Sequence, residues 1–252
     1  MKALKRAIGS LGQLAALLLL AVLALQLYFA GRILLMRWVD PASTAFERAE
    51  MMRLAVDQHR LLWSQEWRPY AQISPHLKRA VIASEDAGFA DHYGVDWDAI
   101  EKAWERNQRA EAAAARRAPK LAHNAAARPV KIVGGSTITQ QLAKNLFLSG
   151  ERTLVRKAQE TAITFMLEAL LSKQRILELY LNHVEWGEGV FGAQAAARHY
   201  FHVDAAALGP SQAARLAVML PAPKRFEKRP GSAYVVGRAG TVMARMGAVE
   251  LP

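Results

Sequence analysis

The chain has 252 residues, of which 52% are hydrophobic and 22% are charged, a composition that allows one sizeable domain with a short appendage and excludes disorder throughout. The formal net charge of +11 indicates an anionic partner, although charge alone does not choose among nucleic acid, lipid headgroups and a phosphorylated substrate. The absence of cysteine excludes disulfides and Cys-ligated metal or iron–sulfur sites.

An apolar stretch near the amino terminus contains the hydrophobic excess. Residues 7–31 carry no formal charge, are rich in Leu and Ala, and are long enough to span the hydrocarbon core of a membrane. Three basic residues precede this stretch and predict a cytoplasmic amino terminus. We therefore predict a cytoplasmic tail over residues 1–7, a transmembrane anchor over residues 8–31 and a periplasmic domain over residues 32–252. A cleaved signal peptide is the alternative, but no convincing A-x-A site closes the stretch.

The rest of the chain has mainly the spacing of amphipathic helices, so the predicted fold class is mainly α. Ser74 followed by Pro75 predicts the start of a helix that continues through Ala83. Residues 109–131 are rich in Ala and Arg with little apolar periodicity, and they predict a basic surface insertion, either a solvated loop or a contact with anionic lipid or substrate. No alternating run is long enough to predict a sheet. Further helices are expected over residues 46–63, 96–108, 137–146, 153–171, 173–182, 193–200 and 211–220.

Two acidic residues, Glu85 and Asp86, directly follow the apolar end of the helix that starts at Ser74. We expect one of them to point into a cleft. A carboxylate near Phe89 and under apolar walls should have a raised pKa, as a general base near neutral pH requires. A helix end with solvent-exposed acids is the simpler interpretation of this segment taken alone.

A second polar stretch begins with two glycines at residues 134–135, which let the backbone come close to a ligand. Ser136 can cap the helix that follows, and a helix N-terminus favours phosphate. Thr137, Gln141 and Lys144 are spaced i, i+4 and i+7, so they should share one helix face that offers donors and a cation, as a diphosphate would need. The alternative is a capped helix whose polar face is simply exposed.

A third stretch contains Arg152, Arg156, Lys157 and Glu160. Arg156 and Glu160 are one helical turn apart and can form an ordinary surface pair, which contributes little. If this helix lines a cleft, the two neighbouring cations become a second phosphate clamp and Glu160 becomes a second carboxylate opposite Glu85. Separated carboxylates and clustered cations suit glycosyl transfer from a sugar diphosphate.

Taken in order, these stretches resemble glycosyltransferase family 51, in particular its monofunctional biosynthetic peptidoglycan transglycosylases. The resemblance covers about residues 73–223 and implies a lysozyme-like, mainly α domain at the outer face of the inner membrane. It implies polymerisation of lipid II through β-1,4 bonds with release of undecaprenyl diphosphate. No Ser-x-x-Lys or Lys-Thr-Gly motif occurs, so penicillin binding is not expected. The motifs are VIASEDAGFADHYGVDW, GGSTITQQLAKNLFL, RKAQE, KQRILELYLNHVEWGEGVFGAQAAARHYF and SQAARLAVMLPAP.

The resemblance implies a role for each matching residue. Glu85 matches the base that takes the proton from the acceptor's GlcNAc 4-hydroxyl, and Glu160 matches a second essential carboxylate. Lys144 and Arg156 are implied to act toward phosphate. The implied substrate-binding residues are Asp86, Phe89, His92, Ser136, Thr137, Gln140, Gln141, Lys144, Asn145, Arg152, Arg156 and Lys157.

The implied partners are lipid II, the growing glycan strand, the membrane, and proteins of cell division or cell-wall synthesis, whereas nucleic acid is not expected. No cofactor is required, and no metal-binding residue is predicted, although Mg or Mn can assist at the diphosphate in some relatives. Residues 109–131 depart from the family because this stretch is longer than usual.

Two other classes of protein remain as alternatives, and a third, a basic nucleic-acid binder, is disfavoured by the predicted anchor. A lytic transglycosylase or muramidase shares the lysozyme-like fold and a catalytic Glu, but it does not need cations for a diphosphate. An inactive membrane-tethered scaffold is the second alternative, and the intact neighbours of Glu85 argue against it.

Overall fold

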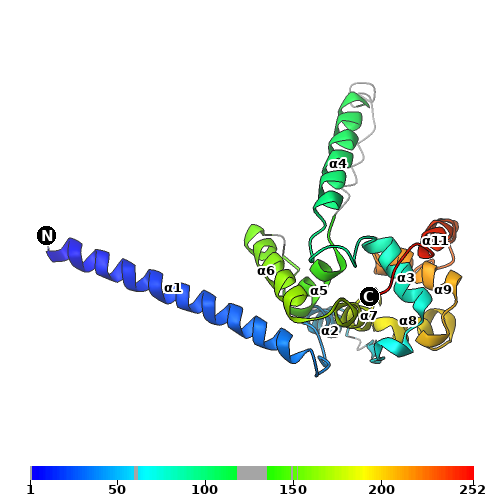
Figure 1. Cartoon of the computed structure of the whole chain (residues 1–252), viewed down its shortest axis with the longest axis horizontal. Coiled ribbons are helices and arrows are strands. Elements are labelled where there is room, and N and C mark those ends of the chain that lie inside the picture. The colour runs from blue at the N-terminus through cyan, green and yellow to red at the C-terminus, as the bar shows by residue number, and fades with distance from the viewer. Residues whose placement is uncertain (1, 60–61, 118–134, 149, 152) are drawn as a thin grey trace.

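The structure, a computed structural model, describes the chain except for residues 1, 60–61, 118–134, 149 and 152. Figure 1 shows a helical body from which two long helices, α1 (Lys2–Leu35) and α4 (Trp97–Arg117), extend in different directions. The body contains the shorter helices α2 (Ala45–Asp57), α3 (Pro75–Glu85), α5 (Ile138–Phe147), α6 (Leu154–Leu170), α7 (Lys173–His183), α8 (Gly192–Phe201), α9 (Pro210–Met219), α10 (Pro223–Phe226) and α11 (Ala233–Met246), with 3-10 helices η1 (Tyr70–Gln72) and η3 (Ala205–Ala207).

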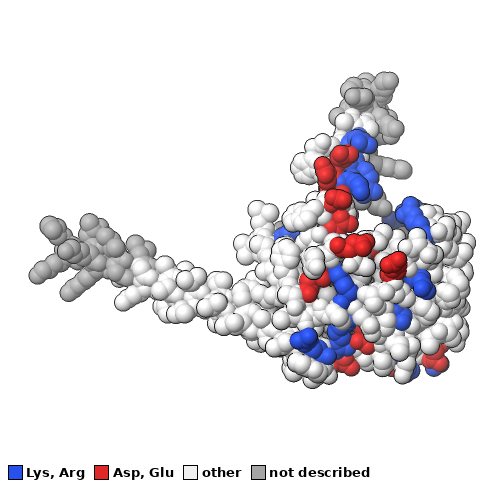
Figure 2. Space-filling model, viewed as in Figure 1, with Lys and Arg blue, Asp and Glu red and all other residues white. Residues whose placement is uncertain are grey.

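α1 is one uninterrupted helix that contains the apolar stretch of the sequence. Its segment Gly12–Leu35 has 24 residues and a mean hydropathy of 2.3, which makes it long and apolar enough to cross a membrane. Between its grey end and the body, α1 shows no charged side chain in Figure 2. The helix continues beyond Gly31, the predicted end of the anchor, because Ile33 and Met36 pack into the core of the body together with Phe29.

Hydroxyl side chains begin the helices that surround the candidate site. Thr44, Ser74, Thr153 and Ser172 each accept a hydrogen bond from a backbone N–H in the first turn of α2, α3, α6 and α7. The prediction that Ser136 caps α5 is wrong. Thr137 has the extended backbone of a cap, and its Oγ1 accepts from the N–H of Gln140 at 3.2 Å, so the helix begins one residue later.

Several helix ends differ from their predicted positions. α3 continues to Glu85, so this carboxylate belongs to the last helical turn. α4 continues to Arg117, because the Ala-rich sequence of the predicted insertion favours helix even without apolar periodicity. Residues 118–131 of that insertion lie outside the described residues. α2 ends at Asp57, earlier than expected.

One hydrophobic core connects the helices of the body and confirms the prediction of a mainly α fold. On one side α9 packs against both α3 and α11, and on the other side α5 packs against α6 and α7. Leu77, Leu142, Ile163, Leu177 and Leu216 are among the side chains that are buried between these helices. The core therefore fixes the end of α3 relative to α5 and α6.

A small three-stranded sheet, which the sequence did not predict, lies beside α8. Its strand order is β1 (Ser64–Gln65), β3 (Val190–Phe191) and β2 (Glu185–Gly187), with β1 parallel and β2 antiparallel to β3. Strands of two or three residues are too short to produce a two-residue period. Gly189 has φ +71°, and a Cβ there would lie 2.1 Å from the carbonyl oxygen of Leu62, so this turn requires glycine.

Candidate active site

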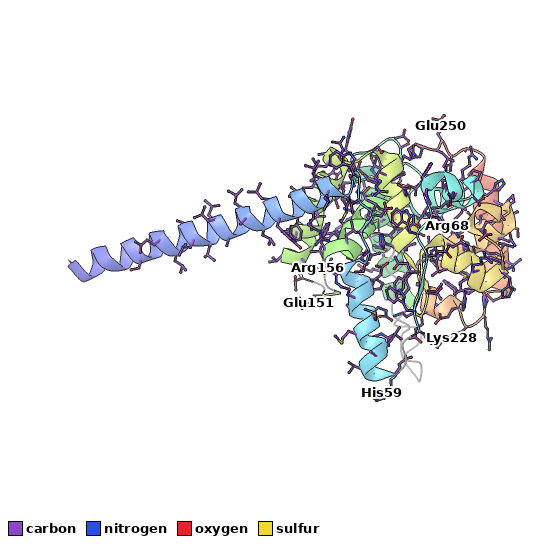
Figure 3. The ribbon with its side chains drawn as sticks, turned by 90° about the horizontal axis from the view of Figure 1, so that it is seen from below. His59, Arg68, Glu151, Arg156, Lys228 and Glu250 are labelled. Atoms are coloured by element: carbon purple, nitrogen blue, oxygen red, sulfur yellow. The ribbon has the colours of Figure 1, made fainter. Side chains whose placement is uncertain are left out.

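A cavity of about 290 Å³ lies between α5 and α6, with Phe46 of α2 at its wall. It brings together polar residues that are widely separated along the chain. The lining residues are Phe46, Ser136, Gln140, Gln141, Lys144, Asn145, Leu148, Gly150, Arg156, Lys157 and Glu160. Figure 3 shows Arg156 on the side of the body from which α1 extends, away from Lys228. Eight of the predicted site residues therefore share one cavity.

The α5 wall of the cavity supplies amides and one cation. Gln140, Gln141, Lys144 and Asn145 all come from this helix. Thr137 does not line the cavity, contrary to the predicted polar face, because as the cap it turns inward and its Oγ1 donates to the carbonyl oxygen of Gly94 at 2.6 Å. The cavity is thus lined by Ser136 before the cap and by residues of α5 after it, but not by the cap itself.

The α6 wall supplies two cations and a carboxylate. Arg156 Nη1 donates to Glu160 Oε2 at 2.7 Å, and Lys157 Nζ donates to Glu160 Oε1. Glu160 is buried, so this pairing holds both cations at the cavity wall and leaves one positive charge in excess. Arg156 Nε is also buried and has no hydrogen-bond partner among the described residues. The wall is therefore suited to an anionic group.

Glu85 stands behind the α5 wall rather than in the lining of the cavity. Gln141 Nε2 donates to Glu85 Oε2 at 3.1 Å, and Gln141 Oε1 accepts from the hydroxyl of Tyr180 at 3.0 Å. Burial raises the pKa of Glu85, and the nearby Asp86 charge adds to this rise, whereas the hydrogen bond from Gln141 opposes it. The raised pKa expected from the sequence is confirmed, and Gln141 connects this carboxylate to the cavity.

Asp86 and His92 brace the start of α5. Asp86 Oδ2 accepts from the N–H of Ile138 at 2.9 Å, and Asp86 Oδ1 lies 2.8 Å from His92 Nε2. His92 Nδ1 accepts from the N–H of Gly94 at 3.1 Å, so the proton of a neutral imidazole lies on Nε2 and is donated to Asp86. A carboxylate at the first N–H groups of a helix also stabilises its dipole. Both residues support α5 from behind the cavity.

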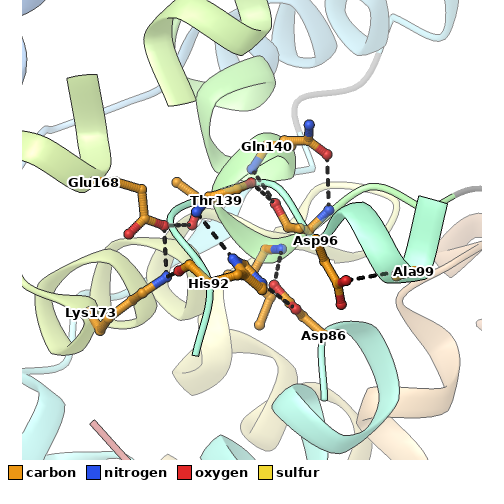
Figure 4. A network of polar contacts seen from close by, with 11 residues as sticks. Asp86, His92, Asp96, Ala99, Thr139, Gln140, Glu168 and Lys173 are labelled. Atoms are coloured by element: carbon orange, nitrogen blue, oxygen red, sulfur yellow. Dashed lines mark hydrogen bonds and ion pairs between the residues drawn. The ribbon is translucent and has the colours of Figure 1, made fainter. Parts of the chain in front are cut away.

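A second set of contacts extends this brace to α6 and α7 (Figure 4). Glu168 Oε1 accepts from Thr139 Oγ1 at 2.6 Å and from Lys173 Nζ at 2.9 Å, and Lys173 Nζ also donates to the carbonyl oxygen of His92 at 2.6 Å. Phe89 is fully buried below Lys173, whose Nζ lies 4.6 Å from the ring centroid. Phe89 therefore belongs to the core beneath the site and not to the cavity.

Among the described residues, one cluster of possible metal ligands is formed by side chains that do not line the cavity. Donor atoms of Asp86, His92 and Asp96 lie within 4.8 Å of one another; Asp86 and His92 contact each other, and Asp96 Oδ1 accepts from the N–H of Ala99 (Figure 4). Among the described residues that line the cavity, the one carboxylate is Glu160, already paired with two cations. The expectation of Mg or Mn at the diphosphate stays a prediction.

Sequence reasoning missed two residues of the site. Phe46 forms a wall of the cavity although it precedes all the polar motifs, and nothing in its local pattern distinguishes it from a core residue. Tyr180 orients Gln141, and its hydroxyl is buried, which raises its pKa well above the usual value. A tyrosine inside an apolar helix face is the signal that could have identified it, because a buried hydroxyl needs a partner. Arg152 and Gly134 lie outside the described residues.

Comparison with known proteins shows which family the sequence matches. Residues 55–247 match the family described as Transglycosylase. A protein of Burkholderia pseudomallei is 52% identical over 92% of this chain and 84% of its own length, and one of Burkholderia orbicola is 51% identical over 92% and 87%. A protein of Paraburkholderia phytofirmans is 48% identical over 95% and 92%. All three are named biosynthetic peptidoglycan transglycosylase.

Proposed function

The chain belongs to the transglycosylase family and is a peptidoglycan glycosyltransferase of lysozyme-like fold, and from this premise we propose that it polymerises lipid II with Glu85 as general base. One observation carries the proposal. A single cavity is lined by Lys144, Arg156 and Lys157, and Gln141 of the same cavity holds Glu85 by a hydrogen bond. Cations for a diphosphate and a base for a hydroxyl are the two things that this reaction needs.

The chemistry requires inversion, because the donor is an α-linked diphosphate and the product bond is β. The 4-hydroxyl oxygen of the acceptor sugar attacks the anomeric carbon of the donor, and its proton passes to Glu85. The bond between the anomeric carbon and the diphosphate oxygen breaks, and the leaving undecaprenyl diphosphate takes the electron pair. A base with a raised pKa is suited to accept that proton near neutral pH.

The leaving group is assigned to the cation-lined wall. Lys144 from α5 and Arg156 and Lys157 from α6 approach the cavity from two sides. We assign Glu160 the role of holding the last two cations at the wall, since both bind it directly. The remaining positive charge favours a diphosphate, which gains negative charge as the glycosidic bond breaks. Arg156 Nε, which has no hydrogen-bond partner among the described residues, can donate to it.

The experiment that tests the function is lipid II polymerisation by the purified full-length protein. We expect glycan polymer and released undecaprenyl diphosphate, with inhibition by moenomycin, to which family 51 enzymes are sensitive. Cleavage of finished sacculi without polymerisation would instead support a lytic transglycosylase. Removal of divalent metal with a chelator should leave polymerisation largely intact. Among the described residues that line the cavity, Glu160 is the one carboxylate that could bind a metal ion.

We further propose that the protein is a single-pass protein of the inner membrane with its catalytic domain in the periplasm. The support is α1, whose apolar segment meets the requirement for a span and leaves a basic tail at the amino terminus. Because the chain has no cysteine, one introduced at exposed Lys228 can be labelled by a membrane-impermeant thiol reagent in spheroplasts. Labelling without membrane disruption is expected, and protection would reverse the assigned orientation.

A further inference from the structure

α1 and α6 are joined by a reciprocal pair of amide hydrogen bonds. Gln26 Nε2 donates to Gln159 Oε1 at 2.9 Å, and Gln159 Nε2 donates to Gln26 Oε1 at 3.0 Å. Both side chains are half-buried. One helical turn further along α1, Phe29 packs edge-to-face on Phe147 with ring centroids 5.2 Å apart, so the amide pair is part of a continuous contact with the body.

Gln26 lies inside the segment that is apolar enough to cross a membrane. It is five residues before Gly31, where the predicted anchor ends, which corresponds to about 7 Å at roughly 1.5 Å per residue. In hydrocarbon no water replaces a missing partner, so a primary amide at this depth needs a protein partner. Gln159 provides it, and this places Gln159 at the same level of the bilayer as Gln26.

Exposed apolar side chains lie on the side of α6 next to Gln159, beginning with Val155 one turn before it. Leu154 is 90% exposed and Val155 is 81% exposed, and Phe165 lies on the same side further along the helix. Of the charged residues of α6 that line the cavity, Arg156 and Glu160 lie away from this side, whereas Lys157 is one turn from Leu154 and is exposed. A helix on the surface of a water-soluble domain has the reverse arrangement, with polar residues outward. This outward face suits acyl chains, and it is continuous with α1.

From this geometry we propose that Gln26 and Gln159 are positioning residues that lock α6 to the membrane anchor. Their amide pair, formed within the bilayer, fixes the level at which the cavity lined by Arg156 and Lys157 opens. That level is the one at which the phosphates of a membrane-embedded substrate lie. The inference rests on the proposed membrane location and lipid-linked substrate, but the contact itself can be tested independently of activity.

The contact is tested by crosslinking in the cysteine-free chain, which needs no background substitutions. The full-length variant Gln26→Cys/Gln159→Cys in native membranes should be joined by a short thiol-to-thiol crosslinker. The matched control is Leu27→Cys/Gln159→Cys, because Leu27 is the next residue of α1 and is 64% exposed. Faster crosslinking at 26 than at 27 is expected. Equal or slower crosslinking at 26 overturns the contact.

The positioning role is tested with two substrates that share the reacting sugar and diphosphate. Lipid II in liposomes requires the correct depth in the bilayer, whereas a short-chain, water-soluble lipid II analogue does not. For Gln26→Leu and Gln159→Leu we expect kcat/KM on the liposome substrate to fall about threefold to tenfold, with the soluble analogue changed less than about twofold. Gln13→Leu is the control, since Gln13 is an exposed glutamine elsewhere on α1.

A double variant distinguishes the pair from two separate packing effects. Gln26→Leu/Gln159→Leu leaves neither amide unpaired in lipid, so its loss should be smaller than the product of the two single losses. Equal losses on both substrates would indicate a general folding defect and overturn the positioning role, as would unchanged kinetics on both. If wild-type protein polymerises neither substrate, the proposed function fails, while the crosslinking result still decides whether the contact exists.

Discussion

The last turn of α3 and the first turns of α6 each present one glutamate near the candidate site, in very different surroundings. Glu85 is half-buried with one amide donor, Gln141, and its partial burial raises its pKa. Glu160 is buried, and it is paired with Arg156 and Lys157. Two carboxylates of identical chemistry are thereby given different tasks. In the proposed mechanism the first accepts a proton, and the second holds two cations at the cavity wall.

The largest loss of activity is expected for Glu85→Gln. Glutamine keeps the shape and the oxygen that accepts from Gln141, but it cannot take a proton. We expect kcat for lipid II polymerisation to fall about 10²- to 10⁴-fold with folding preserved. Glu101→Gln, on the exposed surface of α4, is the matched control and should retain activity. Turnover of Glu85→Gln above about a tenth of wild type would remove Glu85 from the role of base.

The next largest effect is expected for Lys144→Ala on the α5 wall. Loss of a charged donor to the diphosphate should lower kcat/KM about tenfold to a hundredfold. Lys228→Ala is the control, because Lys228 is exposed and lies away from Arg156 (Figure 3). Steady-state kinetics with lipid II measure the difference. If both lysine variants lose activity equally, the effect is one of overall charge and not of this cavity.

The two glutamates should also differ in their effect on stability, beginning with Glu160→Gln. Removing this charge leaves Arg156 and Lys157 beside each other without their common anion, so we expect a loss of about 1–3 kcal/mol in unfolding free energy. For Glu85→Gln we expect the unfolding free energy to rise rather than fall once the pH is above the folded pKa of Glu85. Because the pKa of Glu85 is raised on folding, its stabilising contribution is present at low pH and is lost as pH rises through the folded pKa.

Thermal unfolding of both variants at pH 5 and pH 8 separates these effects. Relative to wild type, Glu85→Gln should gain stability between pH 5 and pH 8, since glutamine removes a buried group that is unfavourable when ionised. Glu160→Gln should be less stable than wild type at both values. The same pH response in both variants would mean that the two carboxylates do not differ as their contacts indicate.

The sequence predicted the members of the cavity better than their arrangement. Gln141, Lys144 and Arg156 could be found because helical spacing and clustered charge are local signals. The inward orientation of the Thr137 side chain could not be predicted, because it depends on a hydrogen bond to the carbonyl oxygen of Gly94, more than forty residues earlier. The roles of Asp86 and His92 as a brace for α5 likewise depend on contacts across the chain.

Helix types were also easier to predict than helix ends. α3 ends at Glu85, two residues later than predicted, and its C-cap is Asp86. The carboxylate of Asp86 accepts a hydrogen bond from the N–H of Ile138 in a different helix, which the local sequence does not reveal. The small sheet was missed because its strands are set by Gly189 and the approach of Leu62, and not by a repeating pattern. Long-range contacts decide both features.

The smallest effect is expected for Gln141→Leu, and it tests how Glu85 is tuned. The hydrogen bond from Gln141 lowers the pKa of Glu85 against the larger effect of burial, so its removal should raise that pKa further. A base works only when it is deprotonated, and activity therefore rises with pH through its pKa. The acidic limb of the kcat/KM profile should move upward, by about one pH unit, and activity at high pH should recover toward wild type. Gln108→Leu, exposed on α4, should leave the limb unchanged. A loss of Gln141→Leu activity that is uniform across pH would show that Gln141 acts on the substrate rather than on Glu85.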